Sequence, residues 1–446
     1  MTLRRRRYGP ETEKLVAEAL ERELWSKERW QAFREERLAF LLHRAATAVP
    51  YYRSYWEKRR RKGDRATWER IENWPVLKKD SLRTSAEAFL AEDRDPRRMT
   101  SERTSGTSGT PVRLWRSVET DRAWYALLET RLRRWNGVSL RDRWAMLGGQ
   151  LVTPASRKKP PFWVWNSGLS QLYMSAYHLS PSTAAAYWEA LRRREVTHII
   201  GYPSALYSLA EMAPAGHGPL PSLRVLISNA EPLSERQRES ISRTFEAPVR
   251  DTYGMVEIAC AASECSSGRM HLWPEVGVLE VLAEESDEPV PAGEAGRFVC
   301  TGLVNPDMPL VRYEIGDRGS LETGQAPCAC GRLLPALAQI EGRLDDVLVT
   351  PDGRRVGRLD PVFKSDLGIR EAQIVQESLN RVVVRVVASN GFEEAHAETI
   401  VREMRRRLGG DVSVTVERVE EIPRTKAGKF RGVVSLLSGR EAARHD

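Results

Sequence analysis

The sequence contains little cysteine and no long apolar run. Its 446 residues include only five cysteines, too few for the disulfide framework that stabilises small secreted proteins. No apolar run approaches the roughly 18 residues that a membrane-spanning helix needs. Four arginines at residues 4–7 lead into Tyr8-Gly9-Pro10 and then into charged residues, not into the apolar core of a signal peptide. We therefore expect a cytoplasmic protein without a membrane partner.

The sequence also has no low-complexity tract and no long run of charge of one sign. Its 69 basic residues are spread along the chain and opposed by 61 acidic ones, which leaves a formal charge of +8. This balance favours anionic ligands such as nucleotides, and we expect no nucleic-acid partner. A globular chain of this length exceeds what one hydrophobic core usually serves, so two or three units are expected.

Hydrophobic periodicity predicts helices first and an α/β region later. Apolar positions at helical spacing over residues 11–47 predict amphipathic helices. Further along, helical patterns at 183–194 and 234–245 alternate with short apolar segments at 198–200 and 224–227. This alternation predicts parallel strands joined by helical crossovers.

The remainder of the chain predicts two smaller parts. Short β-rich segments without intervening helices predict a β subdomain, and they span residues 276–282, 297–301 and 309–313. Past Gly342 a strand, a helix and a second strand predict an α+β unit, and they span 381–388, 393–408 and 412–419. We expect a large N-terminal α/β domain of residues 1–343, with parallel sheets and the β subdomain. A small, mobile α+β lid domain of residues 344–446 follows.

A dense Ser/Thr/Gly stretch, residues 104–111, is the strongest local signal. Its glycines allow a close approach of the backbone to a ligand, and its hydroxyls can bind phosphate oxygens. The G-x-x-x-x-G-K-[ST] pattern of the common phosphate loop occurs nowhere in the chain. The stretch is a candidate phosphate loop, and a flexible linker is the alternative.

Four further clusters carry chemistry that suits a nucleotide. Residues 251–257 combine an aromatic ring, a turn glycine and two carboxylates, enough to stack a base and hold magnesium. Residues 313–317 and 341–346 each combine glycine with charges that could meet ribose or phosphate. Residues 423–431 form a basic loop near the C-terminus. Taken singly, these clusters could equally be a strand end, two solvated turns and a basic tail.

The order of these five elements resembles the core motifs of the adenylate-forming superfamily, which includes the acyl-CoA synthetases. Within it, the chain resembles the phenylacetate-CoA ligase branch and its CapK-like and coenzyme F390 synthetase-like relatives, over about residues 50–440. Three segments indicate this branch: Gly201-Tyr202-Pro203-Ser204, Ala230-Glu231-Pro232-Leu233 and Cys328-Ala329-Cys330-Gly331-Arg332.

The resemblance assigns nucleotide-binding roles to named residues. The loop that binds the β- and γ-phosphates of ATP in relatives corresponds to Thr104, Ser105, Gly106, Thr107, Ser108 and Gly109. Asp251 would accept from the adenine amino group, Tyr253 would stack on the base beside Gly254, and Glu257 would hold magnesium. Two positions depart from the pattern, since most relatives have lysine at Thr110 and threonine at Val256.

The same resemblance assigns the domain junction and the catalytic lysine. Asp317 would accept both ribose hydroxyls, Arg343 would lie near the nucleotide, and Asp345 would mark the hinge. Lys429 would bridge the acid and the α-phosphate, where negative charge grows as the carboxylate attacks phosphorus. Lys426 is the competing candidate for this lysine.

Four soft ligands also suggest a structural metal. Cys265 and His271, followed by Cys328 and Cys330, supply three thiolates and an imidazole, a set suited to tetrahedral zinc. Cys260 is an alternative fourth ligand. Buried free thiols are the alternative to a metal, and a role in the reaction is the least expected.

The resemblance predicts an ATP- and magnesium-dependent ligase that adenylates a small aromatic carboxylic acid, releases pyrophosphate and transfers the acyl group to CoA. Trp163, Trp165, Tyr202 and Asn229 lie in segments that border the acid pocket in relatives. The alternatives are an amine, another nitrogen species or nitrite in place of these reactants, adenylyl transfer to a hydroxyl, and a non-catalytic nucleotide-binding homologue. The sequence leaves open whether the protein is a monomer or a homodimer.

Overall fold

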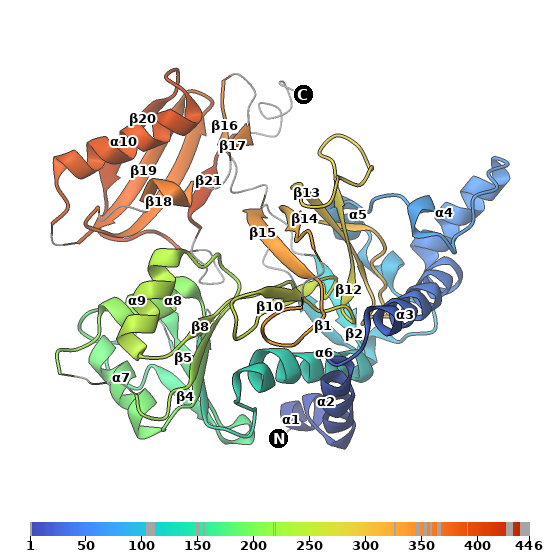
Figure 1. Ribbon diagram of the computed structural model, residues 1–446, viewed down its shortest axis with the longest axis horizontal. Helices are drawn as coiled ribbons and strands as arrows, with labels where there is room; N and C mark the ends of the chain where they lie inside the picture. Colours follow the sequence, from blue (N-terminus) through green and yellow to red (C-terminus); the bar gives the residue numbers. More distant parts are fainter. Residues whose placement is uncertain are drawn as a thin grey trace. The chain divides into compact units, whose positions relative to one another are not determined.

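Figure 1 shows the computed structural model of the chain. It describes residues 2–103, 112–148, 152–154, 157–216, 218, 220–324, 327–343, 348–351, 355–356, 359–363, 367–389, 391–424 and 431–437. The chain forms two compact units, the first comprising Met1–Leu233, Arg238–Ile315 and Gly319–Gln339, and the second Ser234–Gln237, Gly316–Arg318 and Ile340–Asp446. The predicted α/β fold with a smaller α+β part is confirmed, whereas the predicted domain boundary at residues 343/344 stays a prediction.

Four helices open the first unit, as the apolar spacing of residues 11–47 predicts. They are α1 (Thr2–Arg7), α2 (Pro10–Arg22), α3 (Lys27–Ala48) and α4 (Pro50–Arg61). Helices α1 and α2 pack against α6 (Val118–Leu128), which is visible at the N-terminal end of the chain in Figure 1. No helix in the described part of the chain combines the length and the apolar character that a bilayer crossing requires.

A six-stranded sheet forms the α/β part of the first unit, in the order β4-β5-β3-β6-β7-β8. All neighbouring strands run parallel except β4, which is antiparallel to β5. The strands are β3 (Trp144–Gly148), β4 (Trp163–Asn166), β5 (Gln171–Ser175), β6 (His198–Gly201), β7 (Val225–Ser228) and β8 (Val249–Arg250). The crossover helices are α7 (Ala184–Arg193), α8 (Pro203–Glu211) and α9 (Glu235–Phe245).

The alternation predicted from sequence is therefore confirmed. Every residue of β6 and β7 is buried, which explains why these central parallel strands appear as continuous apolar runs in the sequence. The core between this sheet and its helices contains large side chains such as Leu147, Leu172, Leu226 and Phe245.

A seven-stranded sheet in the order β12-β13-β14-β15-β11-β10-β9 is the β-rich part that the sequence predicts. Its strands are β9 (Thr252–Gly254), β10 (Ala261–Glu264), β11 (Met270–Leu272), β12 (Gly277–Leu282), β13 (Gly296–Gly302), β14 (Tyr313–Leu321) and β15 (Ala336–Arg343). The strand expected at 309–313 was placed wrongly, because β14 begins only at Tyr313. Arg312 has a φ of 46°, a left-handed conformation that ends the preceding turn and that sequence periodicity does not register.

The second unit contains a four-stranded sheet, β20-β19-β18-β21, and one long helix. The elements are β18 (Ile369–Ser378), β19 (Arg381–Ala388), α10 (Glu394–Leu408), β20 (Ser413–Arg418) and β21 (Val433–Ser435). Val382, Val384 and Val386 of β19 pack with Ile400 and Met404 of α10 in its core. Both strands and the helix predicted for this part are confirmed. Two short strands, β16 (Leu348–Val349) and β17 (Arg355–Val356), form a separate pair.

A two-stranded ribbon flanks the Ser/Thr/Gly stretch. Strands β1 (Thr100–Arg103) and β2 (Arg113–Arg116) are antiparallel, and Arg103 pairs with Arg113. Residues 104–111, which connect these two strands in the sequence, lie outside the described residues. The described geometry thus fixes the two strand ends from which this stretch leaves and to which it returns.

Candidate functional site

Three candidate residues follow directly after three adjacent parallel strands. Tyr202 follows β6, Asn229 follows β7, and Asp251 follows β8. The registers of Gly201 with Ser228 and of Ile227 with Arg250 place these strand ends side by side. Ligands of open α/β sheets bind outside the carboxyl ends of the strands. The structure therefore brings these three predicted residues to the edge where a ligand is expected.

Asp251 is held by neighbouring hydroxyl and amide groups. Its Oδ1 accepts hydrogen bonds from Ser228 Oγ at 2.5 Å and from its neighbour Thr252 N at 2.9 Å. Burial raises the pKa of Asp251 to about 6, although these two hydrogen bonds oppose the shift. Ser228 was not identified from the sequence, because a single serine at a strand end carries no signal of its own. The carboxyl has fixed geometry and is ready to accept a further hydrogen bond.

Tyr253 and Gly254 lie on β9, immediately after Asp251. The half-buried Tyr253 ring meets the buried Phe298 ring edge to face, with centroids 6.3 Å apart and planes at 74°. Gly254 is exposed and pairs with Ala261 of β10. A ring fixed in this way can offer its other face to a flat base, as the sequence predicts.

Glu257 lies in the turn after β9, and its side chain is only 7% exposed. Tyr313 donates its hydroxyl hydrogen to Glu257 Oε1 at 3.1 Å, and Lys79 Nζ lies 3.5 Å from the same oxygen. A largely buried carboxylate with one ammonium beside it suits the binding of a cation such as Mg²⁺. Lys79 was missed from sequence, because it lies in an irregular stretch without a motif.

Asn229 offers a buried acceptor. Its backbone N–H donates to Gly201 O at 3.1 Å, which links the ends of β6 and β7. Its side-chain Oδ1 is buried and has no hydrogen-bond partner among the described residues. Such an orphaned acceptor costs roughly 1–3 kcal/mol unless a ligand or water satisfies it. This atom is therefore a candidate contact for a ligand donor.

Tyr202 has an aromatic neighbour that sequence reasoning missed. Burial, and secondarily the Tyr202 phenol, raises the pKa of Tyr173 to about 12. Tyr173 lies on β5, next to Met146 of β3 in register. The alternation of strand residues 171–175, in which Tyr173 faces away from Leu172 and Met174, was the available signal.

The two predicted pocket tryptophans lie elsewhere in the sheet. Trp163 and Trp165 belong to the edge strand β4, which β5 and β3 separate from β6. Trp163 packs edge to face on Tyr187 of α7 at 5.7 Å, and the Arg194 guanidinium lies 4.3 Å from the Trp165 ring centroid. The structure thus groups these rings with α7, and it does not place them on the strands that carry Tyr202 and Asn229.

The remaining predicted residues are only partly described. Asp317 is half-buried on β14, and Arg343 is the last residue of β15, with its side chain outside the described part. The following predicted site residues lie outside the described residues: Thr104, Ser105, Gly106, Thr107, Ser108, Gly109, Asp345 and Lys429. Thr110 and Lys426 lie outside them too. Their assigned roles stay predictions.

The four predicted zinc ligands meet in space. One ligand atom each from Cys265, His271, Cys328 and Cys330 lies within 4.8 Å of all the others, and three of the residues are buried. Cys265 Sγ and Cys328 Sγ are 3.7 Å apart, and Cys330 Sγ is 3.5 Å from His271 Nε2. The predicted alternative ligand, Cys260, is not part of this cluster.

The surroundings of this Cys/His cluster fit a metal. His271 Nδ1 lies 3.1 Å from Leu334 O, and since a carbonyl only accepts, Nδ1 carries the proton. The lone pair of Nε2 therefore faces the thiols, as in metal-bound histidines. Burial lowers the pKa of His271, which also favours the neutral imidazole that binds metals. Three thiols and one imidazole are the ligands of structural zinc.

Comparison with protein families identifies two matching segments. The family described as AMP-binding enzyme matches residues 72–304, and the family described as CapK C-terminal domain matches residues 348–435. The first match covers more than half of the chain, and it includes the strand ends that carry Tyr202, Asn229, Asp251 and Glu257.

Curated relatives and solved structures agree with these matches. Protein CapK of Staphylococcus aureus is 25% identical over 395 residues, which is 87% of this chain and 85% of CapK. Phenylacetate-coenzyme A ligase of Thermus thermophilus is 30% identical over 243 residues, 48% of this chain and 54% of that ligase. A solved structure of 2-hydroxyisobutyryl-CoA ligase in the postadenylation state has a TM-score of 0.72 at 22% identity, over 93% of this chain and 91% of that one.

Proposed function

Because this chain belongs to the AMP-binding enzyme family, in the branch of phenylacetate-CoA ligases and CapK, we propose that it uses ATP to adenylate a small carboxylic acid. We further propose an aromatic acid as substrate and CoA as acceptor. The observation that carries the proposal is the meeting of Asn229 and Asp251 at adjacent strand ends, with a buried Asn229 Oδ1 that lacks a described partner. A ligand that donates hydrogen bonds, such as the adenine amino group, would satisfy this edge.

In the proposed reaction, a carboxylate oxygen of the acid attacks the α-phosphorus of ATP in line. The bond from that phosphorus to the bridging oxygen breaks, and pyrophosphate leaves. The thiol sulfur of CoA then attacks the carbonyl carbon of the acyl adenylate, loses its proton, and AMP leaves. No protein nucleophile is needed, so the enzyme acts by positioning its substrates and by stabilising charge.

Each described residue has a definite task in this proposal. Asp251 accepts a hydrogen bond from the base, and the fixed Tyr253 ring stacks on it. Glu257 would hold Mg²⁺, which neutralises phosphate charge when bound. Tyr313 fixes the Glu257 carboxylate through its hydroxyl group. Lys79 lies beside the same carboxylate, so its ammonium adds positive charge where phosphate oxygens would approach.

We also propose that Cys265, His271, Cys328 and Cys330 hold a structural zinc ion. The support is the common 4.8 Å limit on their ligand atoms and the hydrogen bond that orients His271. Four protein ligands leave no open position for substrate, so this ion would stabilise structure and take no part in the reaction.

The proposed function is tested by pyrophosphate release from ATP and Mg²⁺ with a panel of aromatic and aliphatic acids, each with and without CoA. Release that requires one acid would support adenylation, and formation of its CoA thioester would support CoA as acceptor. Glu257→Gln should lower the rate by about 100-fold, since it removes the charge that holds Mg²⁺. Glu285→Gln, which changes an exposed carboxylate to the same amide, should keep the wild-type rate.

Different outcomes would favour other reactions. Pyrophosphate release that continues with an amine but yields no thioester would replace CoA by a nitrogen acceptor. AMP attached covalently to a hydroxyl compound would indicate adenylyl transfer. ATP binding without any release, across the acids and nitrite, would favour a non-catalytic homologue.

A further inference from the structure

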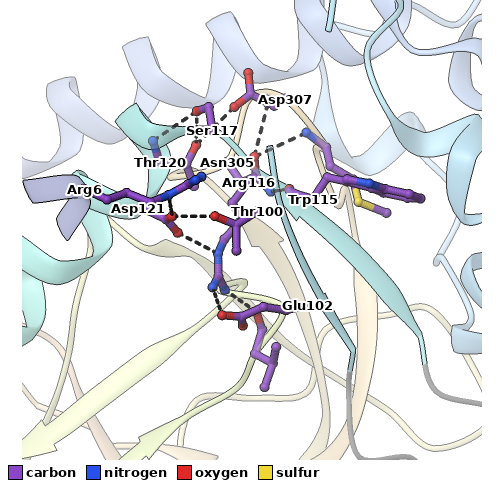
Figure 2. A network of polar contacts seen from close by, with 12 residues as sticks. Arg6, Thr100, Glu102, Trp115, Arg116, Ser117, Thr120, Asp121, Asn305 and Asp307 are labelled. Atoms are coloured by element: carbon purple, nitrogen blue, oxygen red, sulfur yellow. Dashed lines mark hydrogen bonds and ion pairs between the residues drawn. The ribbon is translucent and has the colours of Figure 1, made fainter. Parts of the chain in front are cut away.

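A buried network of charged groups surrounds Asp121 in the first turn of α6 (Figure 2). The Asp121 side chain is 3% exposed. Its Oδ2 accepts hydrogen bonds from Arg6 Nε and from Thr100 Oγ1, both at 2.9 Å, and its Oδ1 accepts from Arg116 Nε at 3.1 Å. Helix α1, strand β1 and strand β2 thus converge on one carboxylate.

Arg116 connects this carboxylate to two further segments. Its Nη2 lies 2.5 Å from Glu102 Oε1 on β1, and its Nη1 donates to Val256 O at 3.3 Å. Val256 immediately precedes Glu257, the candidate magnesium ligand. The Arg116 side chain is 6% exposed, so solvent screens these interactions little. One planar guanidinium therefore fixes β1, β2, α6 and the turn at Glu257 together.

The opposite side of the network is also fixed. Asn305 Nδ2 donates to Trp115 O of β2 at 2.9 Å, and Thr120 Oγ1 donates to Asp307 Oδ2 at 3.3 Å, as Figure 2 shows. Strand β2 is thus held from both sides, close to the point where the Ser/Thr/Gly stretch of residues 104–111 joins it.

We propose that Arg116 is a positioning residue for the β- and γ-phosphates of ATP, and that Arg6 of α1 completes its network through Asp121. This inference rests on the proposed function. Arg116 itself holds the base of the strands that carry the Ser/Thr/Gly stretch, and it holds the backbone beside Glu257. Two structures that would face the same phosphates are therefore fixed relative to each other by one side chain.

The charge balance and the energetics of burial support a positioning role. Two guanidinium groups, of Arg6 and Arg116, face two carboxylates, of Asp121 and Glu102. Such buried pairs contribute little net stability compared with apolar packing, because desolvation offsets their attraction. Their specific gain is fixed geometry, and fixed geometry is what phosphate binding before reaction requires. Arg6 lies outside residues 72–304, so this chain adds its own N-terminal helix to the network.

The test compares the binding of Mg²⁺-ATP and of AMP to the full-length chain by calorimetry. Arg116→Lys keeps the positive charge but cannot reach Asp121, Glu102 and Val256 O at once. We expect roughly tenfold weaker binding of Mg²⁺-ATP and unchanged binding of AMP, which lacks the β- and γ-phosphates. Equal losses for both nucleotides, or no loss for either, would overturn the positioning role, since a merely structural defect does not distinguish the two.

A second pair of variants keeps the test valid if Arg116→Lys does not fold. Arg6→Ala should weaken Mg²⁺-ATP about threefold relative to AMP, whereas Arg5→Ala, an exposed arginine of the same helix, should change neither affinity. An unchanged ATP to AMP ratio in Arg6→Ala would contradict its part in the network. If the wild-type chain binds no ATP, the proposed function fails and this inference fails with it; a failure confined to the variants overturns the inference alone.

Discussion

Asp251 shows how one residue can serve a ligand at a cost to the fold. Its carboxyl receives two hydrogen bonds, from Ser228 and Thr252, yet burial still raises its pKa from 3.8 to about 6. Near neutral pH the folded chain therefore holds a charged group where the neutral form would be more stable. A group that lowers stability in this way, at the end of a parallel strand, is typical of a functional position.

This shift predicts a pH dependence of stability. The unfolded chain ionises Asp251 near pH 3.8 and the folded chain near pH 6, so its contribution is most favourable below pH 4 and is lost as the pH rises to about 6. Asp251→Asn cannot ionise. The free energy of unfolding of the variant, relative to wild type, should therefore increase by about 2 kcal/mol between pH 4 and pH 7.

The measurement is urea unfolding at both pH values, followed by tryptophan fluorescence. All thirteen tryptophans belong to the first unit, so the signal reports the unit that contains Asp251. Asp411→Asn, which changes an exposed aspartate, serves as the control and should show a difference that stays constant with pH. A constant difference for Asp251→Asn as well would contradict the raised pKa.

At the scale of secondary-structure elements, the Cys/His cluster connects two distant parts of the chain. Cys265 and His271 lie at the turn between β10 and β11, whereas Cys328 and Cys330 lie ahead of β15. Strands β11 and β15 pair only through Met270 with Leu337 and His271 with Ala336. A shared metal ion would therefore reinforce a short strand pairing at the centre of the seven-stranded sheet.

The N-terminal helices cover the same cluster. Trp25, Trp30 and Phe33 pack with Cys265 and Cys328 in one buried group. Beside it, Arg332 donates from Nε to Glu23 Oε2 at 3.0 Å. Metal binding should consequently stabilise the seating of α2 and α3 on the first unit as well as the sheet.

We expect the purified protein to contain one zinc ion per chain, measured by inductively coupled plasma mass spectrometry. Cys265→Ser should lose the ion and lower the thermal midpoint by more than about 5 °C, because an incomplete ligand set binds zinc weakly and the bound ion stabilises only the folded state. Cys260→Ser should keep the zinc, since Cys260 lies outside the cluster. A protein without metal, with both variants behaving alike, would favour buried free thiols.

The elements differ in how far the sequence could predict them. Strands β6, β7 and β19 were predicted because continuous apolar runs between turn residues depend on local pattern alone. The start of β14 was missed, since the left-handed Arg312 results from tertiary contacts: its guanidinium donates to Trp74 O at 2.9 Å. Tertiary contacts of this kind leave no periodic signal.

The candidate site shows the same division. Asp251, Tyr253 and Glu257 were found because they are close together in the sequence and form a recognisable motif. The network of Arg6, Asp121 and Arg116 could not be found, because Arg6 and Asp121 are 115 residues apart and no single motif contains both. Resemblance to a family finds residues that the family shares, whereas contacts to the N-terminal helix require the folded structure.

At the scale of the whole molecule, the division into two units assigns different steps of the proposed reaction to each. Asp251, Tyr253 and Glu257 belong to the first unit, whereas Lys429 belongs to the second. Nucleotide binding should therefore depend mainly on the first unit. Bond formation between the acid and the α-phosphate should depend on the lysine of the second, which supplies positive charge only where charge develops in the transition state.

This separation predicts a specific loss in Lys429→Ala. Pyrophosphate release should fall by at least about 1000-fold, while the affinity for Mg²⁺-ATP should change less than about threefold, because the removed charge acts on the transition state. Lys426→Ala, three residues away in the same basic segment, is the matched control and should retain most of the activity. Stopped release in Lys426→Ala with full activity in Lys429→Ala would transfer the role to Lys426. Full activity in both variants would place the charge that stabilises the transition state elsewhere, with Lys79 beside Glu257 as the next residue to change.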